Sequence, residues 1–372
     1  MLSCLRLTVG HLFRATTCPG GPARCTSADS ESEPPRLDHQ ERLRALRALI
    51  DRLSTSRSVD DTSADADPAD ALSEALAELL AADPRFRVLR CLQPRDSYSV
   101  PPQGPVRRGL VVDTETTGLD ATNDRIVEIG MVAFDFDPAT GAVVRVVDTY
   151  GALEDPGMPI PPEITRVNGI SDAMVAGKRI DDDRVAALAS ASDLVIAHNA
   201  QFDRPVCEQR FPVFVEKAWA CSLKQVDWGA CGLPGGKLEL LAYAHGFFYE
   251  AHRAETDCRA LLEVLAREVP EGGTALRRLL ETARRRDVRI WALDSPFESK
   301  DTLRARRYRW SGGEGGLPKA WHVTLPESQV ADELQWLRDT IYGGHGRELR
   351  LDVLDARSRF TTRFSRSEMR AI

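Results

Sequence analysis

The 372-residue sequence lacks several features that would assign it to whole classes of protein. It has no run of about 18 uncharged apolar residues, so it predicts no membrane-spanning helix. Its eight cysteines include no CxxC pair, which argues against a structural zinc site, and their scattered positions are typical of reduced thiols in a cytosolic protein. Lysine is also scarce: arginine supplies 43 of the 49 basic residues, as the codon bias of a GC-rich genome would produce.

Acidic residues are absent from the first 28 positions, which contain three arginines. Transit peptides share this composition, whereas Arg6 and His11 interrupt the apolar stretch that a secretory signal would need. Residues 1–36 are rich in Ser, Pro, Gly and Cys, a composition that does not favour a packed core. We therefore expect a disordered extension over 1–36 rather than a presequence.

What is present is the composition of an ordinary globular protein, with 42% hydrophobic and 28% charged residues. The length allows one large domain and one or two smaller pieces. The formal net charge of −7 is unevenly distributed, because Leu276–Ile372 has 20 Lys and Arg against 14 Asp and Glu, whereas residues 1–275 have 29 against 42. A basic segment on an acidic body suits a phosphate-bearing partner, although a solvated surface produces the same pattern.

Two helices and an acidic linker are predicted before the main domain. Apolar residues recur at helical spacing over 36–53 and again over 68–82. The polar and acidic stretch 56–67 separates the two helices. We expect a helical N-terminal region and linker over 37–107, which serves for packing or for binding a partner.

The middle of the chain has the element order of a mixed sheet with helices on both faces. Gly109–Thr114 is a mostly apolar run that reaches an acid at Asp113, as a buried central strand would. More strands and helices follow in the order βββαβα…α, which implies an α/β domain. The further strands are predicted at Arg125–Asp137, Ala142–Tyr150 and Leu194–His198, and the helices at Asp181–Ser192, Gln201–Arg210, Leu238–Gly246 and Ala254–Glu268.

Short strand patterns alternate with helix patterns from Asp287 to the end, which predicts a small basic α+β domain over 287–372. This region holds four of the six tryptophans. Aromatic and basic side chains together suit a nucleic-acid or partner surface, and core tryptophans explain the aromatics equally well. The predicted strands are Arg289–Leu293, Arg307–Trp310, Ala320–Leu325 and Leu349–Val353, and the predicted helices are Ser299–Arg306 and Glu327–Tyr342.

The strongest chemical signal is a pair of acids at the end of the predicted central strand. Residues i and i+2 of a strand point to the same side, so Asp113 and Glu115 project together. Two neighbouring carboxylates repel, and the repulsion raises one pKa unless a cation compensates it, a task suited to a hard divalent ion with oxygen ligands. On its own, such a pair is more often two acids at a strand end that face water.

Two further blocks, His198–Asp203 and His252–Asp257, each place an acid near the start of a predicted helix, where sheet proteins commonly build their sites. Five residues along a helix amount to about 500° of rotation, so His252 and Asp257 would not share a face of one regular helix. We therefore expect His252 at or before the helix start and Asp257 within the helix, so that both face the end of the central strand.

In their order and spacing the three blocks resemble the DEDDh exonucleases, the DnaQ-like group that includes the proofreading epsilon subunit of bacterial replicative polymerase and RNase T. Asp113 and Glu115 match the first motif and Asp203 matches the second. His252 and Asp257 match the third, and none of these five positions departs from the family pattern. The resemblance runs from about Arg108 to Ala266 and includes the stretches Asp124–Phe134, Pro159–Ser171, Ala220–Leu223 and Leu238–Leu241.

The resemblance implies a ribonuclease H-like α/β fold over 108–270, with a mixed five-stranded sheet whose second strand is antiparallel. It also implies a 3′→5′ exonuclease with two divalent ions, magnesium or manganese, because the ligands are all oxygens. Asp113 would bridge both ions. Glu115 and Asp257 would complete the first metal site, and Asp203 the second. An unperturbed histidine titrates at about pH 6.5, so His252 would take a proton from the attacking water as general base.

Substrate contacts follow from the same resemblance. In that family, groups just past the first-motif acids contact the terminal nucleotide, and Leu119 would wedge against its base. Core packing explains Phe202 equally well, and His198 is expected to be structural. The residues implied to bind substrate are Thr116, Thr117, Gly118, Leu119, Asn199 and Phe202.

The resemblance leaves three functions to be distinguished. The first is an exonuclease on single-stranded DNA in repair or proofreading, in the bacterial cytosol and without membrane contact. The second is RNA 3′-end trimming, since reading of the 2′-OH depends on shape around the last sugar and not on the five catalytic residues. The third is a subunit that acts mainly by binding a DNA polymerase. The sequence has no convincing glutamine-led clamp-binding motif after the nuclease domain, which weighs against the replicative proofreader itself.

Overall fold

The chain divides into two compact units, Met1–Val88 and Leu89–Ile372. The predicted extension over 1–36, and all but Arg47 of the predicted helix over 36–53, lie outside the described residues. Among the described helices, none is both long enough and apolar enough to cross a bilayer. The computed structural model describes residue 47 and residues 68–98, 101–102, 104–270, 272–313, 316–363 and 366–372.

In the first unit, helix α2 (Pro68–Ala81) forms where the helical spacing predicts it. Leu76 and Leu80, one turn apart, are 41% and 43% exposed. Beyond the helix, the carboxylate of Asp83 forms an ion pair with Arg85 at 2.7 Å. The prediction of a second helix is therefore confirmed, and its role stays a prediction.

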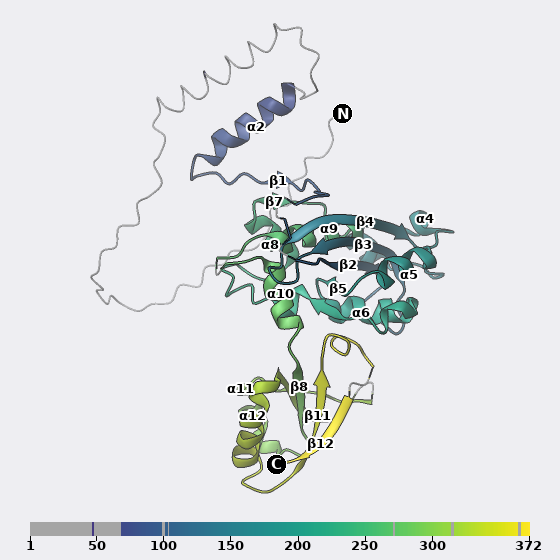
Figure 1. The fold of residues 1–372 in the computed structure, drawn as a ribbon. Coiled ribbons are helices and arrows are strands. Elements are labelled where there is room, and N and C mark those ends of the chain that lie inside the picture. The colour runs from purple at the N-terminus through teal and green to yellow at the C-terminus, as the bar shows by residue number, and fades with distance from the viewer. Residues whose placement is uncertain are drawn as a thin grey trace, which may run out of the picture. The chain divides into compact units, whose positions relative to one another are not determined.

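The second unit is built around a mixed five-stranded sheet in the order β4-β3-β2-β5-β6. Figure 1 shows its strands side by side between helices. The first three strands form an antiparallel meander, whereas β5 and β6 run parallel to β2. The predicted sheet, with its antiparallel second strand, is thereby confirmed. The strands are β2 (Arg107–Thr116), β3 (Ile126–Phe136), β4 (Val143–Leu153), β5 (Leu194–Ala197) and β6 (Trp219–Cys221).

Helices cover both faces of this sheet, as Figure 1 shows for α9 and α6. Along β2, Val111 faces an apolar cluster shared with α8, α9 and α10, whereas Val112 faces a cluster shared with α5 and α6. Every residue of β3 is buried, which is why the strand shows a nearly continuous apolar run in sequence. These helices are α5 (Asp182–Ser190), α6 (Ala200–Arg210), α8 (Leu238–Ala244), α9 (Ala254–Ala266) and α10 (Ala275–Ala283).

The second unit begins at Leu89, earlier than the predicted nuclease boundary at 108. The reason is a segment that pairs with the sheet domain: β1 (Arg90–Cys91) lies parallel to β7 (Phe247–Phe248), and Arg95 forms an ion pair with the buried carboxylate of Glu263 at 2.8 Å. The remaining short elements are α3 (Pro162–Asn168), α4 (Asp172–Val175), the 3₁₀ turn η1 (Pro212–Phe214) and α7 (Ser222–Gln225).

A second, fully antiparallel five-stranded sheet forms the C-terminal part, in the order β12-β11-β8-β10-β9. One face packs on helices α11 and α12, and its apolar core accounts for Trp321 and Trp336. Trp291 is fully buried, and Trp310 is 52% exposed. The elements are β8 (Asp287–Ala292), η2 (Phe297–Ser299), α11 (Lys300–Ala305), β9 (Arg309–Trp310), β10 (Trp321–Pro326), η4 (Glu327–Gln329), α12 (Val330–Trp336), the π-helical turn η5 (Leu337–Ile341), β11 (Glu348–Leu354) and β12 (Arg366–Ala371).

The loop that follows β11 packs against the mixed sheet domain. The carbonyl oxygen of Ala356 accepts a hydrogen bond from the backbone N–H of Trp219 on β6 at 2.7 Å. The fully buried guanidinium of Arg204 on α6 donates to the carbonyl oxygens of Ala356, Arg357 and Arg359. We call residues 355–363 the docking loop, because they fasten the C-terminal sheet to α6 and to the edge of β6.

Candidate active site

Asp113 and Glu115 leave the central strand on the face that α9 covers, as their spacing predicts. Asp113 lies opposite Gly130 of β3, and the strand register shifts directly after Glu115. A Cβ atom on Gly130 would come within 2.1–2.3 Å of backbone atoms of Ala254 and Glu255. Only glycine therefore lets the start of α9 approach the strand this closely beside Asp113.

Asp203 reaches the same place from the opposite face of the sheet. Its Oδ1 atom accepts hydrogen bonds from the backbone N–H of Thr114 at 3.1 Å and from the Thr114 hydroxyl at 2.9 Å. Thr114 stands between the two acids of β2 and points to the α6 face. Acids from both faces of the sheet therefore meet at the carboxyl end of β2, the edge where α/β proteins place their ligands.

The third motif lies across the start of α9 in the expected arrangement. Arg253 caps the helix, so His252 precedes it and Asp257 lies within it. His252 has a φ of 65°, in the left-handed region that few non-glycine residues adopt, and its Nδ1 atom lies 3.9 Å from Oε1 of Glu115. The carboxylate of Asp257 accepts from the Arg253 backbone N–H at 2.9 Å and from the Tyr249 hydroxyl at 3.2 Å.

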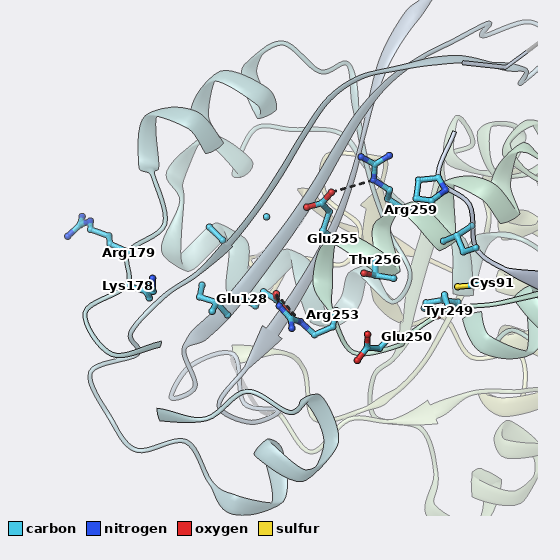
Figure 2. A pocket seen from close by; sticks show the side chains of 15 residues that line it. Cys91, Glu128, Lys178, Arg179, Tyr249, Glu250, Arg253, Glu255, Thr256 and Arg259 are labelled. Atoms are coloured by element: carbon cyan, nitrogen blue, oxygen red, sulfur yellow. Dashed lines mark hydrogen bonds and ion pairs between the residues drawn. The ribbon is translucent and has the colours of Figure 1, made fainter. Parts of the chain in front are cut away.

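Glu128, a buried acid on β3, fixes the turn that carries His252. Its Oε1 atom accepts from the Arg253 guanidinium at 2.9 Å, and its Oε2 atom accepts from the Ala254 backbone N–H at 3.1 Å. Figure 2 shows the Glu128–Arg253 pair in a pocket of about 870 Å³ that Tyr249 also lines. This pocket therefore adjoins the third motif. Glu128 lines the pocket and holds the turn of that motif in place.

Burial and mutual repulsion act on the four carboxylates. Burial raises the pKa of Asp113 well above its ordinary value, and the charges of Asp203, Asp257 and Glu115 raise it further. Burial raises the pKa of Asp203 to about 7 and that of Asp257 to about 6, although hydrogen bonds oppose both shifts. Burial also raises the pKa of Glu115. The four groups are therefore close enough to resist ionising together.

The donor set fits a hard divalent cation, because four crowded carboxylate oxygens are what such an ion stabilises. Over the residues that the structure describes, no three His, Cys, Asp or Glu side chains are placed so that they could already hold a metal ion. The carboxylates of Asp203 and Asp257 are instead held by Thr114 and by Tyr249. Binding of ions would therefore require some of these side chains to move.

Hydrogen bonds between its own residues stabilise the loop after β2. The buried Thr117 donates its hydroxyl to Oδ1 of Asp124 at 2.8 Å, and the Thr116 hydroxyl donates to the Gly118 carbonyl oxygen. A Cβ atom on Gly118 would lie 2.5 Å from the Asp124 carboxylate. Both hydroxyls are thus engaged inside the loop, whereas Leu119 at its tip is 86% exposed and free to contact a ligand.

The second motif surrounds the start of α6. Asn199 has a φ of 143°, and its carbonyl oxygen accepts from the Phe202 backbone N–H at 2.7 Å. Both side chains are half-buried. The ring nitrogens of His198 lie 2.8 Å from the Ser222 hydroxyl and 2.7 Å from the Gly236 carbonyl oxygen, and burial lowers the pKa of this histidine to about 4. These contacts tie His198 into the structure, in agreement with the structural role expected for it.

Three residues at the site were not predicted from the sequence as functional. Glu128 and Tyr249 hold the third motif, and the buried Asn168 donates its Nδ2–H to Oε2 of Glu115 at 3.2 Å. Glu128 and Asn168 lie in the stretches Asp124–Phe134 and Pro159–Ser171 that resemble the family, which was the available signal. The sequence contains no comparable signal for Tyr249.

Comparison with known proteins agrees with this geometry. A model of the family described as Exonuclease matches residues 110–265, a span that contains all three motifs. The DNA polymerase III subunit epsilon of Treponema pallidum is 32% identical over 162 residues, which cover 41% of this chain and 72% of that relative. The PolC-type DNA polymerase III of Caldanaerobacter subterraneus is 29% identical over 165 residues, which cover 42% of this chain and only 11% of the relative.

Among solved structures, exonuclease X in complex with 5′ overhanging duplex DNA has 27% sequence identity and a TM-score of 0.33, and the match covers 45% of this chain and 99% of that one. A structure of exonuclease I has 16% identity and a TM-score of 0.42, with 63% and 71% of the two chains covered. All of these matches leave a substantial part of this chain without a counterpart.

Proposed function

This chain belongs to the exonuclease family, and on that premise we propose that it hydrolyses single-stranded DNA from the 3′ end, one nucleotide at a time, in repair or proofreading. The observation that carries the proposal is the convergence of four carboxylates and one histidine at the carboxyl end of β2. Three of these acids come from separate elements, and each accepts a hydrogen bond from a residue that is not one of the five motif residues. Such a set suits metal-assisted phosphodiester hydrolysis.

Two divalent ions, magnesium or manganese, are the proposed cofactors. As the family resemblance implies, Asp113 would be a ligand of both ions. Glu115 and Asp257 would complete one metal site, and Asp203 would complete the other. When bound, the ions lower the pKa of a water molecule and stabilise the leaving oxygen.

His252 is the proposed general base. Its side chain is about half exposed, so it can reach both a bound strand and solvent. Its Nδ1 atom faces Glu115, which leaves Nε2 as the ring nitrogen that accepts a proton from the attacking water. Glu128 and Asn168 support this step by fixing, respectively, the turn that carries His252 and the carboxylate that faces it.

The terminal nucleotide would lie against the loop after β2 and the start of α6. Leu119 is the proposed wedge against the base, because it is a large apolar side chain with 86% exposure in the loop that follows the two acids of β2. Since the hydroxyls of Thr116 and Thr117 are engaged within the loop, these residues and Gly118 would meet the substrate mainly through backbone groups. Asn199 and Phe202 would contact the sugar and base from the other side.

DNA is favoured over RNA because the relatives named above are components of DNA polymerases. The same names support association with a polymerase subunit as a further proposal, and their bacterial sources support a cytosolic location. RNA trimming stays the alternative, since the catalytic residues themselves do not distinguish the two sugars.

The test is degradation of matched single-stranded DNA, double-stranded DNA and RNA, each labelled at the 3′ or the 5′ end, with magnesium present. We expect immediate release of labelled mononucleotide from 3′-labelled single-stranded DNA, and a ladder of shortening products from the 5′-labelled strand. Release of the 5′ label as a mononucleotide before the strand has shortened would contradict the polarity. Faster degradation of the RNA would favour the trimming alternative.

A further inference from the structure

A cleft of about 700 Å³ lies between α6 and the C-terminal sheet. Its walls come from three places: α6 and α7 of the exonuclease domain, the face of the C-terminal sheet that α11 and α12 do not cover, and the docking loop. On that sheet face, Arg289, Thr324 and Arg350 stand on adjacent strands β8, β10 and β11. Both the exonuclease domain and the C-terminal sheet are therefore needed to form the cleft.

This cleft is separate from the carboxylate cluster. Gln201 and Pro205 line it, and residues four apart share one face of a helix. Asp203 lies two residues from each of them, about 200° around the helix, and so points to the opposite side. A ligand in the cleft would contact the back of the helix that carries Asp203 and not the proposed metal site.

The lining contains nitrogen donors that have no acceptor. The Nε atom of Arg289 and the Nε2 atom of Gln225 are both buried, and neither has a hydrogen-bond partner among the residues that the structure describes. The other end of the Gln225 amide is committed, because its oxygen accepts from the backbone N–H of Cys221 at 2.8 Å. A buried donor without an acceptor is costly, so these two groups indicate a ligand that supplies acceptor oxygens.

The charges of the cleft also indicate a ligand with acceptor oxygens. Both acids in its lining are matched, since Asp352 pairs with Arg350 at 2.7 Å and Asp287 pairs with Arg359 at 2.8 Å. A third lining arginine, Arg363, pairs with Glu208 outside the cleft at 3.1 Å. Arg289 and the exposed Lys224 are then the cations in excess, and they line the same cleft as Gln225. Cationic donors in excess of acceptors suit a phosphate group.

We propose that this cleft is a second, non-catalytic binding site that takes the phosphate group of a nucleotide. The identity of the ligand rests on the proposed function, because an exonuclease meets this group in two forms. One is the uncleaved part of the strand, and the other is the released mononucleotide. Arg289, Gln225 and Lys224 would bind the phosphate oxygens, and α6 would connect the occupied cleft to Asp203.

The test measures binding to the full-length chain in EDTA, so that no hydrolysis takes place. The probes are inorganic phosphate, deoxythymidine monophosphate and a thymidine strand of roughly 20 nucleotides, a length suited to such surfaces. The variants are Arg289→Gln and Lys224→Gln. The control is Arg309→Gln, which removes the same charge from an exposed position on the same sheet but outside the cleft.

For Arg289→Gln we expect affinity for the bound probe to fall about tenfold, as for the loss of one charge-assisted hydrogen bond. We also expect the unfolding temperature in EDTA to stay equal or to rise, because the substitution removes a half-buried cation that makes no hydrogen bond at Nε. If Arg289 had a purely structural role, the substitution would lower the unfolding temperature. If the strand is the ligand, the slope of the logarithm of its binding constant against the logarithm of salt concentration becomes shallower by about 0.7 for one lost contact. If the mononucleotide is the ligand, only the two small probes are affected.

The proposal is overturned if the wild-type chain binds none of the three probes, or if both cleft variants bind them as the wild type does. An equal loss in Arg309→Gln would also overturn it, since the effect would then be one of general charge. Because cleavage is not measured and no metal is present, failure of the exonuclease assignment would leave this result unaffected.

Discussion

At the scale of single residues, three of the four carboxylates of the site accept a hydrogen bond from a residue that is not itself one of the five motif residues. Asn168 donates to Glu115, Thr114 donates to Asp203, and Tyr249 donates to Asp257. These bonds fix the acids against the repulsion that raises the pKa of Asp113. The four acids therefore stay close together at some cost in stability, which bound cations would relieve.

The variant Asp113→Asn tests the centre of this arrangement. We expect cleavage to be abolished with magnesium present, because the proposed bridging ligand is lost. In EDTA we expect the thermal unfolding temperature to be unchanged or higher, since the substitution removes a buried charge that its acidic neighbours repel. An Asp113→Asn protein that retains substantial activity would show that the site is wrongly assigned.

Glu128→Gln tests whether the turn before α9 must be braced. The change keeps the shape but weakens the bonds to Arg253 and to the Ala254 N–H, so His252 and Asp257 should lose their alignment. We expect the cleavage rate to fall about 10- to 100-fold, as for other residues that orient metal ligands. The matched control is Glu255→Gln, which alters an acid in the first turn of the same helix that forms an ion pair with Arg259. Equal losses in both variants would contradict a specific role for Glu128.

The motif acids could be predicted from the sequence, and the residues that hold them could not. Asp113 and Glu115 follow from strand alternation, and His252 from the angular spacing that places it before α9. Asn168 lies 53 positions from Glu115, and only the packing of α3 beside β2 brings them together. No local pattern contains such a contact.

At the scale of elements, helix α6 joins three parts of the molecule. It carries Asp203 toward the active site, Gln201 toward the cleft, and Arg204 into the docking loop. The Arg204 guanidinium also forms an ion pair with Glu208 one turn away at 2.7 Å. A fully buried cation is tolerated here because carbonyl oxygens and one carboxylate satisfy it.

Arg204→Lys tests this connection. Lysine keeps the charge but lacks the planar fork that reaches three carbonyl oxygens, so buried acceptors would be left unpaired. We expect a loss on the order of 3 kcal/mol in the free energy of unfolding by urea. Arg363→Lys, which alters a more exposed arginine bound to the same Glu208, should cost no more than about 1 kcal/mol. Similar small losses in both variants would mean that the docking loop does not depend on Arg204.

Elements with strong periodicity could be predicted, and those defined by their neighbours could not. Strand β6 is only three residues long, Trp219–Cys221, and exists as a strand through its pairing with β5. Strand β12 is exposed along its whole length, so it has no apolar alternation to detect. The predicted helix over Glu327–Tyr342 is instead a 3₁₀ turn, a short α-helix and a π-helical turn in succession. Helix α10, in contrast, carries Leu276, Leu279 and Leu280 at helical spacing and could have been predicted.

At the scale of the whole molecule, the basic C-terminal region is part of the exonuclease unit as well as a candidate binding surface. Removal of Asp287–Ile372 would leave Arg204 and the Trp219 N–H without their carbonyl partners and would expose the edge of β6. We therefore expect the truncated chain to unfold at a clearly lower temperature than the full chain, or to aggregate. A calorimetric transition at the temperature of the intact chain would show that the exonuclease domain does not need the docking loop.

The central claim is that the carboxylates at the end of β2 hold metal ions for exonuclease chemistry. The most direct measurement follows a 5′-labelled single strand of DNA incubated with the full-length chain that has been thoroughly chelated, before and after manganese is added. We predict no shortening in EDTA and a ladder of products that shorten from the 3′ end once manganese is restored. Undiminished cleavage after chelation would contradict the account.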